Sequence, residues 1–388
     1  MITREELRQL ASIESPESCA VSLYYQPITP QNKSHREEVI LLKDLVRDAL
    51  RQAESCGRSF ACRDDLRRLM DVAEHLHGNH ARAKAIFACG PQKIWKEYDL
   101  PPRLARSMVT INSRFHLRPL TAVFDAGARC CIALVDRERA RLFDYWLDEL
   151  GEREQFFDRL PPHGRSDGFA GYEAGHKQRR VGSDAMQHFK RFADRLKELV
   201  SWSEFERLIV GCRDDTWPEV EPHLHPYVRL RLLGRFAVDP ATATAEQVRA
   251  QAGRILGEHV SAERQALIRE VIGNAQRDGR GAIGLRNVLT ALERGEVQTL
   301  LLGQNFSAHG VRCRHCGHMD TRSTRSCAVC GSVPGEMDDI SDALIGEAVR
   351  RGVGIVYVPP ESAFDRVGNI GALLRFRADQ NTPAKVAI

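Results

Sequence analysis

The sequence predicts an α/β protein of three domains, and three observations support this prediction. Short apolar runs bounded by glycine or proline alternate with segments of helical hydrophobic spacing along the chain. The length of 388 residues, with 43% hydrophobic and 28% charged residues, suggests two or three globular domains. Four of the 11 cysteines are grouped towards the C-terminus with the spacing of metal ligands.

Two classes of protein are not favoured by the sequence. It has no run of eighteen apolar residues, so we expect no membrane span. Residues 1–10 are charged and lack the apolar stretch of a secretory signal, so we expect a cytoplasmic protein. In that reducing compartment the seven scattered cysteines should be buried hydrophobes or inert thiols: Cys19, Cys56, Cys62, Cys89, Cys130, Cys131 and Cys212.

The first predicted block covers residues 1–124. Residues 19–25 alternate like a strand and end near Pro27 and Pro30. Ser34 can cap a helix with Glu37 as its partner in a capping box, and apolar residues then recur at helical spacing up to Leu50. We expect a second helix over about 63–76 and a strand over 85–89.

The second predicted block covers residues 125–260. Residues 130–135 form a short apolar run typical of a buried strand, and 139–147 should return as its hairpin partner. A glycine-rich loop over 164–175 is expected to precede a helix from about Gly182 to Trp202, and a strand over 208–212 follows. This order predicts a mixed or parallel sheet covered by helices.

The third predicted block covers residues 261–388. It should begin with a charged helix over 262–276 and continue with a helix that ends near Leu292 and a strand over 299–303. A cysteine-rich insertion at 310–334 interrupts it. The block then resumes with a helix over 342–351 and strands over 354–358 and 372–377.

The insertion carries the most specific motif in the chain. Cys313-Arg-His-Cys316 and Cys327-Ala-Val-Cys330 are two CxxC pairs separated by ten residues, and Gly317 and Gly331 permit a tight turn after each pair. Four thiolates at this spacing fit tetrahedral Zn²⁺ with no open coordination position, so the predicted site is a structural zinc ribbon. Free cysteines would leave this polar segment without a core. His315 and His318 are alternative ligands that we expect to be exposed instead.

Basic residues are concentrated in one segment although the net charge is only +4. Residues 163–197 contain eight basic and four acidic side chains, and six of the basic ones are candidate RNA contacts: Arg165, Lys177, Arg179, Arg180, Lys190 and Arg191. A concentrated cationic stripe attracts a polyanion. A solvated helix face is the other interpretation, and the charge pattern alone leaves both open.

Four passages, in the same order along the chain, resemble the archaeo-eukaryotic peptide-release factors and their Pelota relatives. They are residues 114–122 (RFHLRPLTA), His163-Gly-Arg165, residues 289–302 (LTALERGEVQTLLL) and residues 368–377 (GNIGALLRFR). The similarity extends over almost the whole chain. The chain is similar in particular to the bacterial branch of this family, which includes Balon-type proteins.

This resemblance implies three folds: a decoding-type N-terminal domain, an RNase H-like middle domain, and a C-terminal domain like a ribosomal kink-turn-binding protein. It also implies binding in the ribosomal A site, with the basic segment against ribosomal RNA. By family analogy alone, a translational GTPase such as elongation factor Tu is a candidate partner.

The sequence departs from the family where release factors carry a Gly-Gly-Gln loop that hydrolyses peptidyl-tRNA. Here His163-Gly-Arg165 is followed by Ser166-Asp-Gly168, without a glutamine. The nearest downstream glutamine is Gln178, three positions after Gly175. Gln178 is either a displaced catalytic residue or an ordinary polar residue beside a basic run, and the missing second glycine favours the latter.

The codon-reading motifs of the family are also incomplete. Asn32-Lys-Ser34 stands where an Asn-Ile-Lys-Ser loop belongs, and Val109, Ile111 and Phe115 stand at the Tyr-x-Cys-x-x-x-Phe motif, where only the phenylalanine is kept. Without the other residues the base-edge contacts that specify a codon are missing. We therefore expect no codon-specific termination.

Other motifs point to no further chemistry. A cysteine nucleophile needs a positioned general base, and the sequence suggests none near Cys212 or the Cys130-Cys131 pair. Packing in the core is therefore the better interpretation of these cysteines. His223 and His225 lie among three prolines, which favours an exposed loop over a metal pair. There is no Walker A loop.

Three functions follow. The first is a non-catalytic factor in the A site of stalled or idle ribosomes, acting in rescue or hibernation. The second is a peptidyl-tRNA hydrolase that uses the segment from Gly164 to Gln178. The third, weaker, is an RNA-binding module that acts away from the ribosome.

Overall fold

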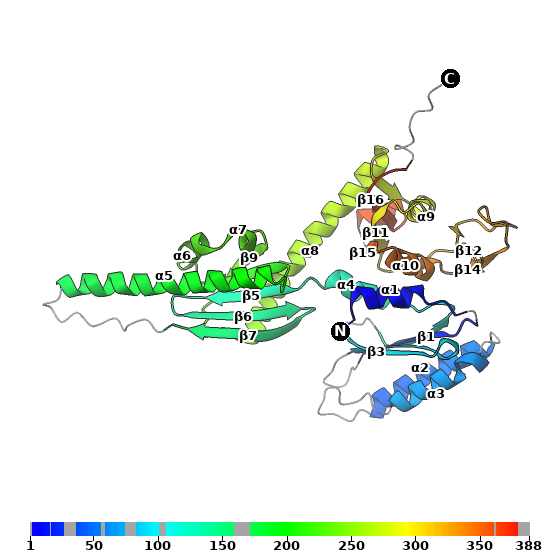
Figure 1. The fold of residues 1–388 in the computed structure, drawn as a ribbon, viewed down its shortest axis with the longest axis horizontal. Helices are drawn as coiled ribbons and strands as arrows, with labels where there is room; N and C mark the ends of the chain where they lie inside the picture. Colours follow the sequence, from blue (N-terminus) through cyan, green and yellow to red (C-terminus); the bar gives the residue numbers. More distant parts are fainter. Residues whose placement is uncertain are drawn as a thin grey trace, which may run out of the picture. The chain divides into compact units, whose positions relative to one another are not determined.

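The computed structural model describes residues 2–15, 17–26, 36–55, 59–73, 83–100, 106–158, 171–360 and 362–378, and the side chains of 36, 38, 55, 59–61, 73, 126 and 171–182 are outside that description. The predicted mixed α/β architecture is confirmed, and the described residues form four separate sheets. The chain forms two compact units, Met1–Asp125 with Arg264–Ile388, and Ala126–Glu263 (Figure 1). Because the first and third predicted blocks share one unit, their division into separate domains stays a prediction.

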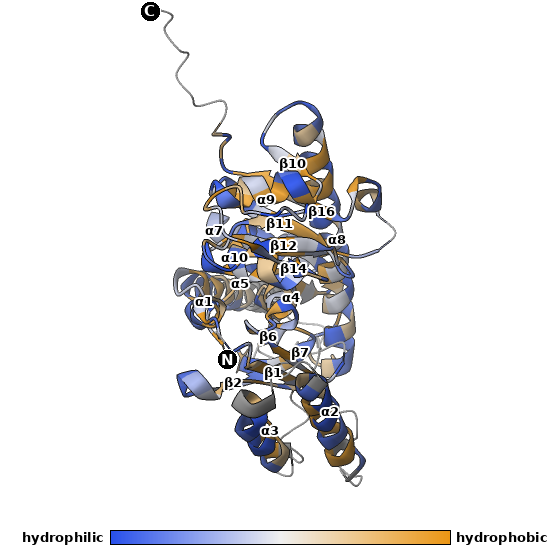
Figure 2. Ribbon diagram, turned by 90° about the vertical axis from the view of Figure 1, so that its right-hand side faces the viewer, coloured by the Kyte–Doolittle hydropathy of each residue, from blue (hydrophilic) through white to orange (hydrophobic). Residues whose placement is uncertain are grey.

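The N-terminal part of the first unit is an antiparallel sheet with helices on its faces. It contains α1 (Arg4–Ser12), β1 (Ala20–Tyr25), α2 (Arg36–Ser55), α3 (Ser59–Ala73), β2 (Ala83–Cys89), a 3-10 turn (Gly90–Gln92), β3 (Ile94–Leu100) and β4 (Met108–Asn112). The strand order is β3-β2-β1-β4. Helices α2 and α3 lie side by side against the sheet (Figures 1 and 2).

The predicted strands of this part can be compared with the structure, whereas the predicted helix cap cannot. The strands predicted at 19–25 and 85–89 are confirmed as β1 and β2, which are central and almost fully buried. Helix α1 was not predicted, although Thr3 and Glu6 form a capping box at its start. The predicted cap at Ser34 lies outside the described residues.

The C-terminal part of the first unit has a second sheet and a small cysteine-rich sheet. The larger sheet has the order β10-β16-β11-β15, and its strands are β10 (Gly281–Ile283), β11 (Val297–Gly303), β15 (Gly354–Val358) and β16 (Ile370–Leu374). Its helices are α9 (Leu285–Glu293), α10 (Ser341–Arg350) and a 3-10 turn (Ala363–Val367). The small sheet, β13-β12-β14, consists of β12 (Gly310–Cys313), β13 (Met319–Asp320) and β14 (Pro334–Met337).

The second unit has one five-stranded sheet with the order β7-β6-β5-β8-β9. Strands β5 (Cys130–Val135), β6 (Arg139–Trp146) and β7 (Glu149–Phe157) form an antiparallel meander. Strands β8 (Arg207–Cys212) and β9 (Leu232–Ala237) continue parallel to β5. This order and these directions are those of the RNase H-like fold, as expected.

The sheet of the second unit is buried on both faces, which explains its apolar central strand. Alternate residues of β5 point to opposite faces. Cys131, Ala133 and Val135 pack with Phe189 and Phe192 of helix α5 (Gly171–Ser201). Cys130, Ile132 and Leu134 pack with residues of helix α8 (Ala245–Gln276). A connecting helix, α4 (Arg118–Ala126), precedes β5.

Two predicted helix boundaries are wrong. Helix α5 begins at Gly171 and not near Gly182, because extending an existing helix costs little per residue and glycine opposes it by only about 1 kcal/mol. Helix α8 begins at Ala245 and not at 262. The signal for its true start was in the sequence: Thr244 and Gln247 bond reciprocally as a capping box.

Candidate metal centre and cationic surfaces

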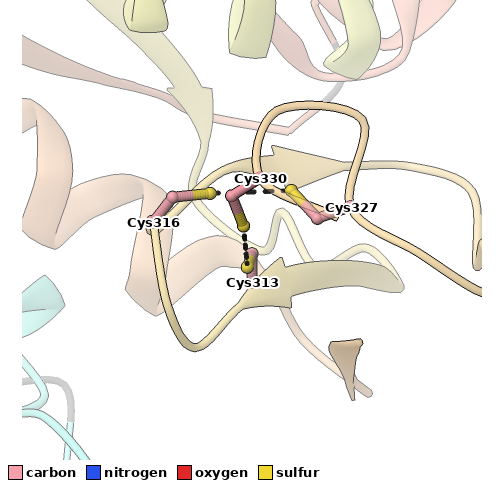
Figure 3. A group of neighbouring side chains, drawn as sticks. All are labelled: Cys313, Cys316, Cys327 and Cys330. Atoms are coloured by element: carbon pink, nitrogen blue, oxygen red, sulfur yellow. Dashed lines mark hydrogen bonds between the residues drawn. The ribbon is translucent and has the colours of Figure 1, made fainter. Parts of the chain in front are cut away.

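The four grouped cysteines converge on one point. Cys313 ends β12, Cys316 follows in its turn, and Cys327 and Cys330 come from the second turn (Figure 3). The four sulfur atoms all lie within 4.8 Å of one another, with Cys313 and Cys330 3.4 Å apart and Cys316 and Cys327 3.5 Å apart. A tetrahedral Zn²⁺ with bonds of about 2.3 Å requires sulfur atoms separated by about 3.8 Å. The cluster can therefore hold a metal ion.

The backbone around the two cysteine pairs is nearly a repeat. Cys313 N–H donates to the His318 carbonyl at 2.8 Å, and Gly317 N–H donates to the Cys313 carbonyl at 2.9 Å. In the second turn, Cys327 donates to Ser332 at 2.7 Å and Gly331 to Cys327 at 2.9 Å. Gly317 and Gly331 both have φ of +76°, which only glycine adopts without strain. The predicted role of the two glycines is confirmed.

Local hydrogen bonds favour the ionised form of one of these thiols. The Ser332 backbone N–H, followed by its hydroxyl, lowers the pKa of Cys330 to about 5. A thiolate is the form of cysteine that binds metal. A backbone hydrogen bond with His318 lowers the pKa of Cys316, but burial and the neighbouring cysteines outweigh it and raise this pKa to about 12. The match to a structural zinc ribbon therefore rests on the convergence of the four sulfur atoms.

The two nearby histidines are not part of the cluster. His318 is partly buried, and its Nδ1 lies 2.6 Å from Glu293 Oε1 on α9. Met319 N–H donates to the same carboxylate oxygen at 3.1 Å. His315 is exposed, as predicted. His318 therefore fastens the cysteine-rich sheet to α9.

The described part of the basic segment lies on α5. Arg165 is outside the described residues, and Lys177, Gln178, Arg179 and Arg180 lie in α5 with side chains outside the description. Lys190 is exposed and, among the described residues, has no ion-pair partner.

Two arginines of the same helix are paired with carboxylates that come from β7, from the residue after it and from the helix itself. Arg191 Nη1 lies 2.7 Å from Asp158 Oδ1, and its guanidinium stacks over Phe156. Arg195 is paired at 2.8 Å with both Glu154 and Glu198. A cleft of about 400 Å³ along β7 and α5 has equal numbers of cations and anions: Lys190, Arg191, Arg195, Glu154, Asp194 and Glu198. This surface is less cationic than the sequence count predicted.

Sequence reasoning missed a buried histidine that contacts the same aspartate. His188 is fully buried, its Nδ1 lies 2.7 Å from Asp158 Oδ2, and its Nε2 has no partner among the described residues. Asp158 thus links the end of β7 to two residues of α5. The helical spacing of Ala185, His188 and Phe192 could have predicted that His188 is buried.

The remaining motifs are structural. Burial raises the pKa of Cys212 to about 11 and that of Cys130 to about 12, so both are inert thiols, as expected. The exposed loop predicted around His223 and His225 is instead three short helical turns: α6 (Trp217–Val220), a 3-10 turn (Glu221–His223) and α7 (Pro226–Arg229). Each of the three prolines stands in a first turn, where its missing N–H costs nothing.

Comparison with known proteins finds a family match in the middle part of the chain. Residues 116–256 match the family described as bacterial archaeo-eukaryotic release factor family 10. This segment is therefore similar to the bacterial relatives of the archaeo-eukaryotic release factors. The release-factor match covers the whole second unit except its last residues.

Two curated relatives are also release factors. Peptide chain release factor subunit 1 of Pyrococcus abyssi is 25% identical over 257 residues, which are 58% of this chain and 62% of that protein. The match therefore spans about three fifths of the relative's length. The same protein of Thermococcus onnurineus matches at the same identity and coverage.

Among solved structures, Saccharomyces cerevisiae Dom34 is 10% identical with a TM-score of 0.40, over 78% of this chain and 82% of Dom34. It is described as a translation termination-like factor that interacts with Hbs1.

Residues 114–121 connect the N-terminal and C-terminal parts of the first unit. Arg118 donates to the carbonyls of Gly303, Gln304 and Phe306 at 3.1, 2.8 and 2.8 Å. Upstream, His116 Nδ1 lies 2.8 Å from Asp342, and Thr121 lies 2.6 Å from the Tyr357 hydroxyl. Arg114 pairs with Glu14. Residues 114–121 thus join the N-terminal and C-terminal parts of this unit.

The family's two functional loops fall largely outside the description. Asn32-Lys-Ser34 and residues 159–170 lie outside the described residues. Gln178 lies on the helical backbone of α5, and not in a loop as the hydrolase hypothesis assumed. Phe115 is 3% exposed and packs in the core against Phe87, so it presents no ring to an RNA base.

Proposed function

We propose that this release-factor homologue is a ribosome-binding translation factor. It occupies the A site of stalled or idle ribosomes, in rescue or hibernation, and does not terminate at specific codons. The observation that carries the proposal is the family match over residues 116–256, supported by relatives that are peptide chain release factors. The assignment to the cytoplasm follows from this proposal, because the A site is reached there.

Helix α5 supports contact with ribosomal RNA. Lys190 and Lys197 are exposed, seven residues and therefore two turns apart, and neither has a carboxylate partner among the described residues. Lys177, Arg179 and Arg180 precede them on the same helix. We propose that these residues, with Arg165, contact phosphates. Arg191 is the weakest member of the predicted set, because Asp158 already neutralises it.

Binding to ribosomes tests the proposal directly. Purified protein should sediment with ribosomes at low salt and less at high salt. Neutralising Lys177, Arg179 and Arg180 together should weaken binding and flatten its dependence on salt by a slope of about 3. Protein that stays in the supernatant even at low salt would reject the proposal.

We propose that the factor does not hydrolyse peptidyl-tRNA. The alternative places Gln178 in a catalytic role, but that residue lies on a continuous helix and the Gly-Gly pair is missing. A release assay with wild type and Gln178→Ala decides between the two. Release by wild type that the substitution abolishes supports the hydrolase, whereas equal release, or none from either protein, removes it.

We further propose Zn²⁺ as the ion held by Cys313, Cys316, Cys327 and Cys330. Four thiolates leave no open coordination position, so the ion would have a structural role. For delivery to the ribosome we propose a translational GTPase such as elongation factor Tu, on the family relationship alone. Co-purification with the GTPase loaded with a non-hydrolysable GTP analogue tests this partner, and no enrichment over the GDP form would remove it.

A further inference from the structure

The two cysteine turns and the loop between them carry exposed basic residues that are separate from the basic segment of α5. We define the ribbon tip as residues 313–331, the two cysteine pairs and the loop between them. It contains three arginines, and its single acidic residue is Asp320. Asp320 Oδ1 accepts hydrogen bonds from Thr321 N–H and hydroxyl at 2.6 and 3.3 Å. The only carboxylate of the tip is therefore already engaged.

The three arginines of the ribbon tip have no partner within the part of the chain that the structure describes. Arg314, Arg322 and Arg325 are exposed, and among the described residues none of their guanidinium groups pairs with a carboxylate or donates a hydrogen bond. Arg312, only one residue before the tip, behaves differently. It is 17% exposed in its side chain and lies 3.2 Å from Glu14. The sequence alone does not distinguish the paired arginine from the free ones.

The free arginines do not serve the metal centre. A tetrathiolate zinc site carries a net negative charge, which nearby guanidinium groups could offset. Hydrogen bonds to sulfur come instead from Ser332 and from the backbone, as from Val329 N–H to Cys327 Sγ at 3.4 Å. Within the described residues, none of the three arginines donates to a cysteine sulfur. The three arginines are therefore not explained by hydrogen bonds that stabilise the thiolates.

The ribbon tip is also held in a defined position within its own unit. Arg312 is tied to Glu14 after α1, and His318 is tied to Glu293 on α9. Binding through a fixed surface loses less conformational entropy than binding through a mobile arm. Arginine is suited to bidentate contact with phosphate. Three free arginines on a fixed support therefore match a polyphosphate.

We propose that Arg314, Arg322 and Arg325 form a second RNA-contacting surface, which binds the phosphate backbone of ribosomal RNA. The inference rests on the proposed ribosome binding and adds a contact on a different unit from α5. It assigns the zinc-type ribbon two roles. The cysteines fold the loop, and the loop presents the cations.

The test compares salt dependence of ribosome binding between two triple variants. Arg314→Ser, Arg322→Ser and Arg325→Ser together should lower the slope of log affinity against log salt by about 2 to 3. The matched control changes the same charge at exposed arginines that are paired with carboxylates, Arg213→Ser, Arg249→Ser and Arg254→Ser. The control should change the slope by less than about 1. A metal content equal to that of wild type shows that the tip of the variant is folded. If the triple variant loses metal, the double variant Arg322→Ser with Arg325→Ser replaces it, because both residues lie outside the cysteine pairs.

A crosslink identifies the partner. Val333 is 76% exposed and lies just beyond the second cysteine pair, so a photoreactive amino acid there should crosslink to ribosomal RNA. Crosslinks to ribosomal protein alone overturn the inference. The inference is also overturned if wild type binds ribosomes and the ribbon variant shows the same salt slope as wild type. That outcome leaves the proposed function intact. Wild type that does not bind ribosomes rejects both.

Discussion

The ribbon tip and helix α5 both carry basic side chains, but the two regions treat these charges differently. On α5, the charges of Arg191 and Arg195 are neutralised by carboxylates from β7 and from the helix itself. On the ribbon tip, Arg314, Arg322 and Arg325 have no partner among the described residues. A count of charges along the sequence gives α5 more basic residues for RNA binding than the ribbon tip. Ion pairs within the folded protein reduce this difference, because they occupy some of the cations of α5.

The two regions also differ in what keeps them folded. Helix α5 buries Phe189, Phe192 and Leu196 in a hydrophobic core. Within the ribbon tip, Cys313, Met319 and Cys327 are the buried side chains, and Val329 is 67% exposed. The fold of α5 should therefore depend on apolar burial, and that of the tip on metal.

The largest effect should follow loss of one metal ligand. Cys327→Ser leaves three thiolates, and structural zinc sites contribute on the order of 10 kcal/mol to the folding of small zinc domains. We expect the variant to lose stoichiometric zinc in native mass spectrometry, and residues 310–337 to lose protection from hydrogen exchange. His315→Ala, in the same turn but not a ligand, should keep both. Full zinc in the serine variant would contradict the assignment.

The second effect concerns the core under α5. Phe192 is fully buried, so Phe192→Ala should destabilise the second unit by about 3–5 kcal/mol through lost burial and a cavity. Denaturant unfolding followed by hydrogen exchange in α5 measures this change. Zinc content should be unchanged. If the substitution released zinc as well, the two regions would not be stabilised independently.

Much of this contrast was predictable from the sequence, because it depends on local patterns. The spacing of Cys313, Cys316, Cys327 and Cys330 specifies their convergence, and glycine at 317 and 331 specifies the turns. The apolar run at 130–135 specified a buried central strand. Each signal lies within about twenty residues.

What the sequence did not reveal depends on distant partners. Arg191 meets Asp158, which is 33 residues away, and Arg312 meets Glu14, 298 residues away. Nothing near Arg312 in the sequence distinguishes it from Arg314. The starts of α5 and α8 were predicted wrongly for a different, local reason. Glycines at 171 and 175 were taken to exclude a helix although α5 includes both, and the capping box at Thr244 was not recognised as the start of α8.

The third effect tests the neutralisation of α5. Asp158→Asn should weaken the bond to buried His188 and cost about 1–3 kcal/mol of stability. It should also release Arg191, so ribosome binding should become tighter at low salt and its salt slope steeper by about 1. Asp194→Asn removes the same charge from an exposed carboxylate of α5 that has no partner among the described residues. This control should leave stability unchanged and steepen the slope less than Asp158→Asn does.

The smallest change in stability, with a clear change in binding, is expected at the free lysines. Lys190→Gln with Lys197→Gln removes two unpaired surface charges, so the free energy of unfolding should stay within about 0.5 kcal/mol of wild type. The salt slope of ribosome binding should fall by about 2, one for each phosphate contact. Arg195→Gln provides the contrast, because that arginine is held by Glu154 and Glu198 and should change the slope little. If Arg195→Gln lowered the slope as much as the two lysine changes together, pairing within the protein would not decide which cations are available to RNA.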